Sequence, residues 1–207
     1  MTIETPQPGA PLSQRLKQAT FQQHERMHRL MALAQPFSSR SQYAKFVAAQ
    51  YLFQRDVEHL FADPDVQRLV SDLSERGRAD DSRADLVDLQ APIPDEPIAT
   101  HGVAAPEALG WLYVSEGSTL GAAFLLKEVS DKLGLDGGFG ARNLAAYPDG
   151  RARAWKRFVG ELDAPRLSVV QDRVIAGAQA AYERFGQLLG TQFGLCDTTD
   201  AQPGHRW

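Results

Sequence analysis

Two histidines one helical turn apart, His24 and His28, are the first residues of the 207-residue chain whose types and spacing could do chemistry. The pair could share a small metal ion. We expect no carboxylate or cysteine beside the pair as a further ligand, and therefore no closed zinc site. One neutral imidazole can instead hold a single axial position of haem iron, whose in-plane ligands come from the porphyrin. His24 is the candidate ligand, although most helical histidines are ordinary surface or core residues.

A glycine-containing helix is the second unusual feature. The stretch E-A-L-G-W-L-Y-V-S-E-G-S-T-L-G-A-A-F-L-L-K, residues 107–127, contains Gly110, Gly117 and Gly121. Each glycine costs about 1 kcal/mol relative to alanine in a helix interior, so something must compensate. Steps of seven and four residues place all three on one helical face. That face could pack closely against another helix, or it could kink and form a slot for a planar ligand opposite a histidine helix.

Basic and hydroxyl side chains could hold the carboxylates of such a ligand at its solvent edge. Lys17 precedes His24 by seven residues, two helical turns or about 10 Å along one axis. This span is of the order of the distance from haem iron to a propionate group. Tyr113 could assist through its hydroxyl. A solvated surface lysine and a core tyrosine with a wet tip remain the alternative interpretations.

The elements that must position these residues are predicted to be helical throughout. Apolar spacing of three and four residues predicts helices over 12–34, from Ser38 or Ser39 to Leu60, and over 65–76, 83–89, 106–133, 150–163 and 167–193. We find no useful strand alternation, internal repeat or low-complexity tract. The sequence therefore predicts an all-α, single-domain helical bundle over residues 12–193, with flexible segments at 1–11 and 194–207.

Composition limits the class of protein further. With 43% hydrophobic and 23% charged residues, the chain can bury one sizeable core. The lone Cys196 excludes an internal disulfide framework, and we expect it to be incidental. A net charge of -4 gives no field that would collect nucleic acid. With neither a leader nor a long apolar run in view, we expect a soluble, cytoplasmic protein that does not bind a membrane.

Three segments resemble the haem oxygenases, particularly the bacterial iron-acquisition branch. L-K-Q-A-T-F-Q-Q-H, ending at His24, is similar to the proximal-ligand segment of that family. F-V-A-A-Q-Y-L-F-Q and A-L-G-W-L-Y-V-S-E-G-S-T-L-G-A-A-F-L resemble its second helix and its distal helix, the latter being the most specific match. R-V-I-A-G-A-Q-A-A-Y fits the last long helix more weakly. The resemblance covers roughly residues 12–193 and implies a porphyrin held between a proximal and a kinked distal helix.

The resemblance also implies roles for single residues. His24 would bind the iron, and Gly117 and Gly121 would lie over the distal face of the haem. Lys17, Tyr113 and, more loosely, Lys156 match positions on the propionate side.

Two positions depart from the family pattern. Many members have a glutamate one turn after the axial histidine to accept its second ring proton, and His28 stands there in this chain, so the partner of His24 is open. The mammalian branch has an aspartate after the first distal glycine, and here that residue is Ser118, whose hydroxyl could hold ordered water in its place.

The activity implied is oxidative cleavage of haem b, as substrate and cofactor together, by O2 and reductant to biliverdin, CO and Fe2+. Gly117, Gly121 and Ser118 are the expected catalytic positions, where bound oxygen is bent toward one meso carbon and receives a proton. Members that cut away from the α-meso carbon generally lack the lysine found at Lys17, so we expect biliverdin IXα.

Electrons must come from a partner. The glycines of residues 134–140 follow a helix instead of a strand, and no nicotinamide or flavin fingerprint is present. A ferredoxin or a flavoprotein reductase could supply electrons to a monomeric enzyme. The main alternative is a non-enzymatic haem carrier or sensor, and a third is a helical bundle that binds another planar molecule.

Overall fold

The computed structural model describes residues 10–147 and 150–195, which are mostly helical. Its helices are α1 (Leu12–Ala19), α2 (Phe21–Ala34), α3 (Arg40–His59), α4 (Pro64–Leu69), α5 (Ala79–Asp88), α6 (Ala105–Leu133), α7 (Arg151–Leu162) and α8 (Gln171–Phe193). Apart from two isolated β-bridges at Asp136, these residues contain no strand. The predicted all-α class is confirmed. Cys196, His205 and residues 1–9 lie outside the described ranges.

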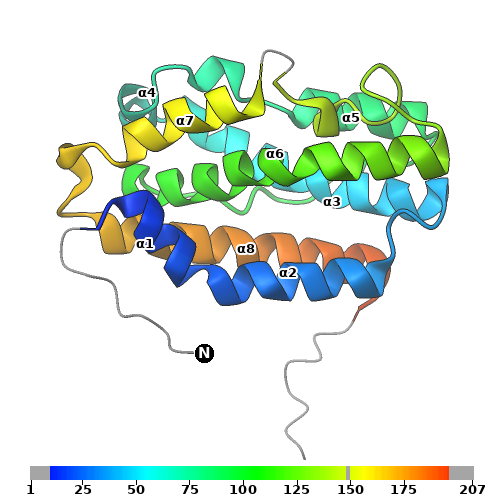
Figure 1. Cartoon of the computed structure of the whole chain (residues 1–207), viewed down its shortest axis with the longest axis horizontal. Coiled ribbons are helices and arrows are strands. Elements are labelled where there is room, and N and C mark those ends of the chain that lie inside the picture. The colour runs from blue at the N-terminus through cyan, green and yellow to red at the C-terminus, as the bar shows by residue number, and fades with distance from the viewer. Residues whose placement is uncertain (1–9, 148–149, 196–207) are drawn as a thin grey trace, which may run out of the picture.

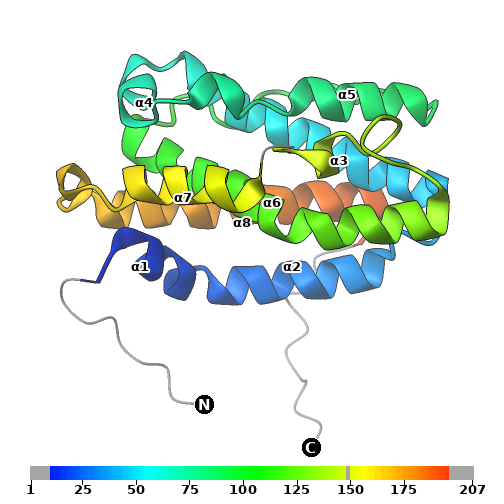
Figure 2. The ribbon, with the colours of Figure 1, turned by 45° about the horizontal axis from the view of Figure 1, so that its top comes forward.

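The long helices run along the long axis of the molecule (Figure 1). α6 passes through the middle, with α3 and α8 beside it and α7 over one side, while α1 and α2 form the lower edge (Figures 1 and 2). α8 is the common support, because it packs against α6, α3 and α2. None of the described helices is long and apolar enough to cross a membrane.

The first predicted helix, 12–34, is broken at Thr20, so that prediction was wrong in this detail. Thr20 has φ -104° and ψ 6°, outside helical values, and its hydroxyl donates to the Leu16 carbonyl oxygen at 2.8 Å. Such a hydrogen bond back to the preceding turn bends helices. α1 and α2 therefore point in different directions (Figure 1), and Lys17 and His24 do not share one straight axis.

The second predicted helix is confirmed as α3, which buries several aromatic side chains. Ser39 caps this helix, its Oγ accepting from the Gln42 backbone N–H at 3.2 Å. Phe46 and Phe53 are buried, and their rings lie 6.5 Å and 5.4 Å from that of Phe185 on α8. Edge-to-face contacts of this kind fix how α3 packs against α8.

The segment between α3 and α6 departs from the prediction. The expected helix 65–76 is the short α4 followed by a 3-10 turn at Leu73–Glu75, and the expected helix 83–89 begins earlier, at Ala79. The half-buried Glu58 explains the early start, since its Oε1 accepts from the backbone N–H groups of Arg78 and Ala79. A cap supplied from α3 leaves no local signal in the sequence.

The crossing of α6 and α8 depends on two glycines. A Cβ added at Gly110 would lie 2.1 Å from the Val174 carbonyl oxygen, and one at Gly177 would lie 2.0 Å from the Glu107 carbonyl oxygen. The backbones meet too closely for any side chain. Of the two alternatives left open for the glycine face, close helix packing is therefore the correct one at Gly110.

The long connection before α6 is tied to the core by Asp56. Its carboxylate accepts from the Ala99 backbone N–H at 2.8 Å and from Nε of Arg184 at 2.9 Å, and its carbonyl oxygen accepts from the Thr100 hydroxyl at 2.7 Å. α6 then runs without a break to Gly134, which ends it at φ 64°, a left-handed value that favours glycine. The predicted end of this helix is confirmed.

Candidate functional site

His24 and His28 lie together on α2 with both side chains exposed. Their ring centroids are 4.5 Å apart in an edge-to-face arrangement, and the Tyr182 ring of α8 lies 6.5 Å from that of His24. Nδ1 of His24 is 3.8 Å from Oε1 of Glu25, which is too long for a hydrogen bond. With 55% of its side chain exposed, the imidazole of His24 is free to bind a ligand.

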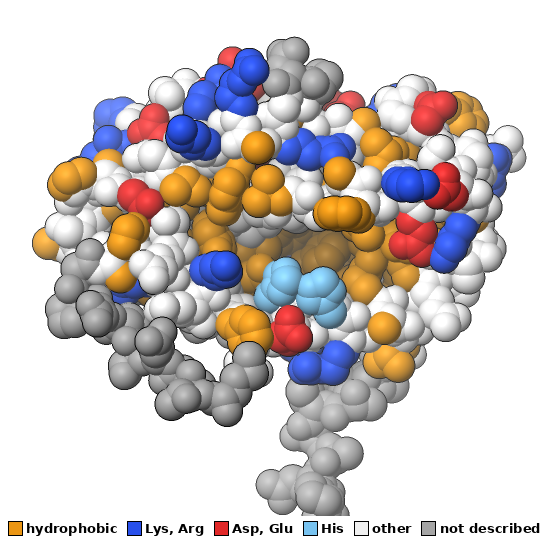
Figure 3. Space-filling view, viewed as in Figure 1, with side chains coloured by type: hydrophobic (Ala, Val, Ile, Leu, Met, Phe, Trp, Pro, Cys, Tyr) orange, Lys and Arg blue, Asp and Glu red, His pale blue; other side chains and the backbone are white. Residues whose placement is uncertain are grey.

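A hollow lined by hydrophobic side chains opens above α2, and the histidines of that helix lie at its rim (Figure 3). α2 rests on α8 at Gly186, where an added Cβ would lie only 3.0 Å from Cε of Met27. Exposed apolar side chains on the bordering helices α2 and α6 include Phe21, Leu33, Leu120 and Phe124. When a large apolar ligand covers such a surface, the release of water makes the free energy of binding more favourable.

The glycines of α6 beyond Gly110 face open space. A Cβ added at Gly121 would meet nothing within 4 Å, and one at Gly117 would meet only the Trp155 ring, at 3.7 Å. The hydroxyls of Ser118 and Thr119 donate to the carbonyl oxygens three residues before them, at 2.7 Å and 2.6 Å. This part of α6 thus combines bare backbone with hydroxyl groups directed at its own carbonyls.

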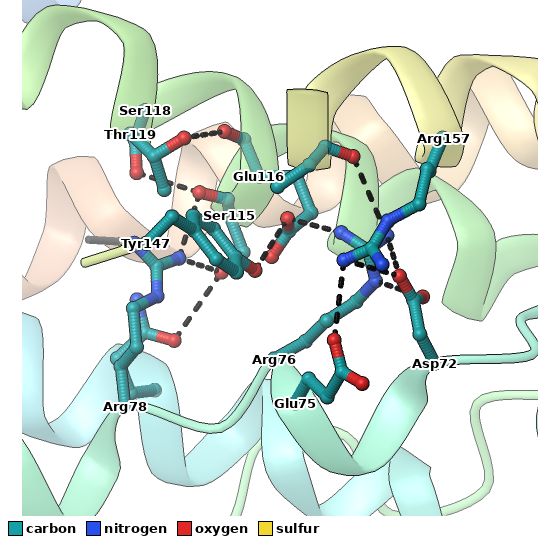
Figure 4. Close-up of polar contacts among 12 residues, drawn as sticks. Asp72, Glu75, Arg76, Arg78, Ser115, Glu116, Ser118, Thr119, Tyr147 and Arg157 are labelled. Carbon is teal, nitrogen blue, oxygen red and sulfur yellow. Dashed lines mark hydrogen bonds and ion pairs between the residues drawn. The ribbon is translucent and has the colours of Figure 1, made fainter. Parts of the chain in front are cut away.

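A buried ionic cluster surrounds Glu116, the residue before Gly117 (Figure 4). Glu116 accepts from the guanidinium of Arg76 and, at 2.7 Å, from the hydroxyl of Tyr147. Arg76 also donates to Asp72 at 2.7 Å and 2.9 Å. Side-chain exposure is 1% for both Arg76 and Glu116, and Oε1 of Glu116 is buried without a partner among the described residues.

The charges of this cluster support one another. Burial alone would lower the pKa of Arg76, but hydrogen bonds to Asp72 and the charge of Glu116 outweigh it and raise that pKa. Burial, and then the Glu116 charge, raise the pKa of Tyr147, which keeps its phenol protonated as a donor. Glu116 immediately precedes Gly117, so the cluster holds the α6 backbone in place next to its open glycines.

A second set of contacts holds the same turn of α6. Arg78 donates to both the carbonyl and the hydroxyl oxygen of Ser115, and that hydroxyl donates to Oε1 of Gln54 at 3.2 Å. We did not predict either set from the sequence. The signals available were an aspartate and an arginine four residues apart at 72 and 76, and a charged residue inside the most apolar helix.

Tyr113 joins α6 to the beginning of α2. Its side chain is 8% exposed, packs 5.5 Å from the Trp155 ring and is hydrogen-bonded to the Thr20 side chain. Burial raises the pKa of Tyr113 to about 12, so its hydroxyl stays protonated at neutral pH. The structure thus brings Tyr113 to a residue one turn before His24.

The two candidate lysines are exposed. Within the described parts of the chain, neither Lys17 on α1 nor Lys156 on α7 makes a hydrogen bond or an ion pair. Lys156 follows Trp155, the residue that contacts both Gly117 and Tyr113. Both ammonium groups are available to an anionic ligand.

Comparison with known proteins identifies the class. The heme oxygenase family model matches residues 10–191, and the chain belongs to this family of haem-degrading enzymes. It is 48% identical over 184 residues to heme oxygenase PigA of Pseudomonas aeruginosa, covering 87% of this chain and 92% of that protein. The resemblance noted in the sequence is confirmed.

Solved structures agree with this assignment. Heme oxygenase from Neisseria meningitidis, solved in NO- and CO-bound forms, superimposes with a TM-score of 0.85 at 35% identity, covering 95% of this chain and 99% of that one. Heme oxygenase 2 from Chlamydomonas reinhardtii gives a TM-score of 0.73 at 17% identity, with 91% of this chain and 100% of that one covered, a likeness of fold alone.

Proposed function

We propose that this chain binds haem in the hollow between α2 and α6, with His24 as the axial iron ligand, and cleaves it to biliverdin, CO and Fe2+. The observation that carries the proposal is an exposed imidazole at the rim of an apolar hollow, with open backbone at Gly117 and Gly121 on the bordering helix. These residues fit a flat, largely apolar macrocycle. When bound, haem supplies through its iron the redox chemistry that side chains lack.

The role of the protein is to position the haem and to keep larger groups out of the space where a small ligand binds. His24 would hold the haem iron, and the haem would supply the site at which O2 reacts. Gly117 and Gly121 would leave room for a small ligand beside the bound haem, where a larger side chain would block it. Ser118 and nearby backbone carbonyls can hold the water that delivers a proton. The cluster of Glu116 and Arg76 keeps this backbone in place.

The first test is a visible spectrum. Purified wild-type protein given haem, then ascorbate or reduced ferredoxin in air, should lose its Soret band as biliverdin forms. The His24→Ala variant should lose the axial-histidine spectrum, and His24→Ala combined with His28→Ala tests whether the second histidine at the rim replaces it. A carrier or sensor would keep its Soret band under reductant and air, and that result would refute the enzyme.

The glycine face has its own test. Gly121→Phe should still bind haem through His24 but lose ring oxidation, because the phenyl group occupies the oxygen position. Gly121→Ala is the matched control and should keep both properties, since a methyl group meets nothing within 4 Å. Biliverdin formation at the wild-type rate by Gly121→Phe would contradict this placement.

We also propose that Lys17, with Tyr113 and Lys156, binds the propionates and directs cleavage to the α-meso carbon. The support is two exposed ammonium groups that have no partner among residues 10–147 and 150–195, and a phenol that stays protonated. Chromatography of the product should show biliverdin IXα, and Lys17→Ala should give a mixture of isomers. The electron donor, a ferredoxin or flavoprotein reductase, would dock near this edge of a monomeric cytoplasmic enzyme. An unchanged single isomer from Lys17→Ala would remove the lysine from this role.

A further inference from the structure

Glu25 changes the interpretation of the histidine pair on α2. One ligand atom each from His24, Glu25 and His28 lies within 4.8 Å of the others, and no other group of three such residues occurs within residues 10–147 and 150–195. The expectation that no H-E-x-x-H pattern and no carboxylate accompanies the two histidines was therefore wrong, because residues 24–28 read H-E-R-M-H. Adjacent residues on a helix usually diverge, but the long Glu25 side chain reaches back toward the His24 ring.

Two imidazoles and one carboxylate are the donors that proteins use for non-haem ferrous iron, with the remaining positions left to water. Metal-to-ligand distances are about 2.0 to 2.2 Å for such donors, so the three groups must draw together slightly. Their exposure makes this possible, since the side chains of His24 and Glu25 are 55% and 45% exposed and His28 is exposed too. Small rotations of exposed side chains cost little.

We propose that His24, Glu25 and His28 form a binding site for a divalent transition cation, Fe2+ in particular, in the haem-free protein. The role of this site rests on the proposed function, in which His24 is also the axial ligand of haem. When the macrocycle opens, Fe2+ already has one protein ligand in His24. Glu25 and His28 then supply the next two ligands at the rim of the hollow, on the path to solvent.

In this proposal His28 is a metal ligand, and it does not act as the hydrogen-bond acceptor for the ring N–H of His24. A residue that only orients His24 would affect haem binding and leave cation binding by the haem-free chain unchanged. Loss of a metal ligand would instead weaken cation binding by the haem-free chain and leave haem binding unchanged. The cation and haem also compete for His24, so each should exclude the other.

The experiment is an anaerobic titration of haem-free, full-length protein without a histidine tag, using Co2+ followed by absorbance and Fe2+ followed by calorimetry. Wild-type protein should bind one equivalent in a saturable manner. His28→Ala and Glu25→Gln should each weaken binding by about tenfold or more, as expected for loss of a ligand. Haem-loaded wild-type protein should not take up this equivalent.

A matched control is the other histidine pair. His59 and His101 have ring centroids 4.6 Å apart, and His59 is already paired through Nδ1 with the Thr100 hydroxyl at 3.2 Å. His59→Ala with His101→Ala should leave the titration unchanged. If this control lowers cation binding as much as His28→Ala, or if His28→Ala and Glu25→Gln bind like the wild type, the proposal is wrong.

The haem spectrum keeps this outcome separate from the proposed function. His28→Ala should still give an axial-histidine spectrum with haem, because His24 is intact. Wild-type cation binding by His28→Ala, together with a normal haem spectrum, would overturn the cation site alone. If His24→Ala gives the same haem spectrum as the wild type, the proposed function is wrong.

Discussion

The two helices that border the hollow are built in opposite ways. α2, which carries His24 and His28, has only one buried residue, Ala34, and both histidines are exposed. α6 has a buried face from Ala105 to Thr119, and Glu116, just before its open glycines, is held by two partners inside the protein. The distal backbone is thus fixed in advance, whereas the proximal side chains can move.

This difference suits the two tasks. Regioselective attack on one carbon requires a distal surface whose position is set before the ligand arrives. Binding a macrocycle and releasing it after cleavage requires a proximal helix that yields. Substitutions on α6 and its supports should therefore affect stability far more than those on the exposed face of α2.

The largest effect is expected from Arg76→Met. Removing the guanidinium leaves Glu116, with a side chain 1% exposed, as a buried charge without its cation. Breaking a buried ion pair from one side costs about 3–5 kcal/mol. Urea denaturation of the haem-free protein should show this loss in the free energy of unfolding.

Arg157→Met is the matched control. Arg157 pairs with Asp72 and Glu75 at 3.1 Å, but its side chain is 51% exposed (Figure 4). An exposed pair contributes about 0–1 kcal/mol, so this variant should unfold close to the wild type. Equal losses for the two arginines would show that the buried cluster does not support α6 as described.

The next effect separates the glycines of α6. Gly110→Ala should destabilise the protein by about 1–3 kcal/mol, because its Cβ would press on the backbone of α8 at Val174. Gly121→Ala should instead stabilise it by about 0.5–1 kcal/mol, since the site is open and alanine favours helix. Thermal unfolding of both variants measures the difference, and shifts of the same sign would contradict the assignment.

The sequence predicted the long helices well because periodicity depends on which face of a helix is apolar. It could not distinguish Gly110 from Gly121, since a glycine that faces a ligand and one that faces a helix leave the same pattern. The break at Thr20 was missed because nothing in the apolar spacing changes there.

Of the candidate site, the resemblance supplied the residues and the structure supplied their surroundings. His24 and the two open glycines could be named from motifs. The buried pair of Arg76 and Glu116 could not be named in this way. Charged residues are rarely buried, and the two members of this pair lie forty positions apart in the chain. Glu25 was missed although the sequence shows it, because residues 24–28 read H-E-R-M-H and match the H-E-x-x-H pattern of metal sites.

The smallest effect concerns the link between the two helices. Tyr113→Phe removes the hydroxyl bonded to the Thr20 side chain and should cost about 0.5–1.5 kcal/mol at neutral pH. Burial raises the pKa of Tyr113 to about 12, above the unfolded value of about 10. The fold therefore favours the neutral phenol, and this contribution is complete below pH 10 and is lost as the pH rises through 12.

Urea midpoints of wild type and Tyr113→Phe, measured from neutral pH upward, test the link directly. The raised pKa values of other buried tyrosines, such as Tyr147, act equally in both proteins and cancel in the difference. The wild type should lose more stability than the variant between about pH 10 and pH 12, so that the two curves converge. Parallel curves would mean that the Tyr113 phenol is not held neutral between α6 and α2.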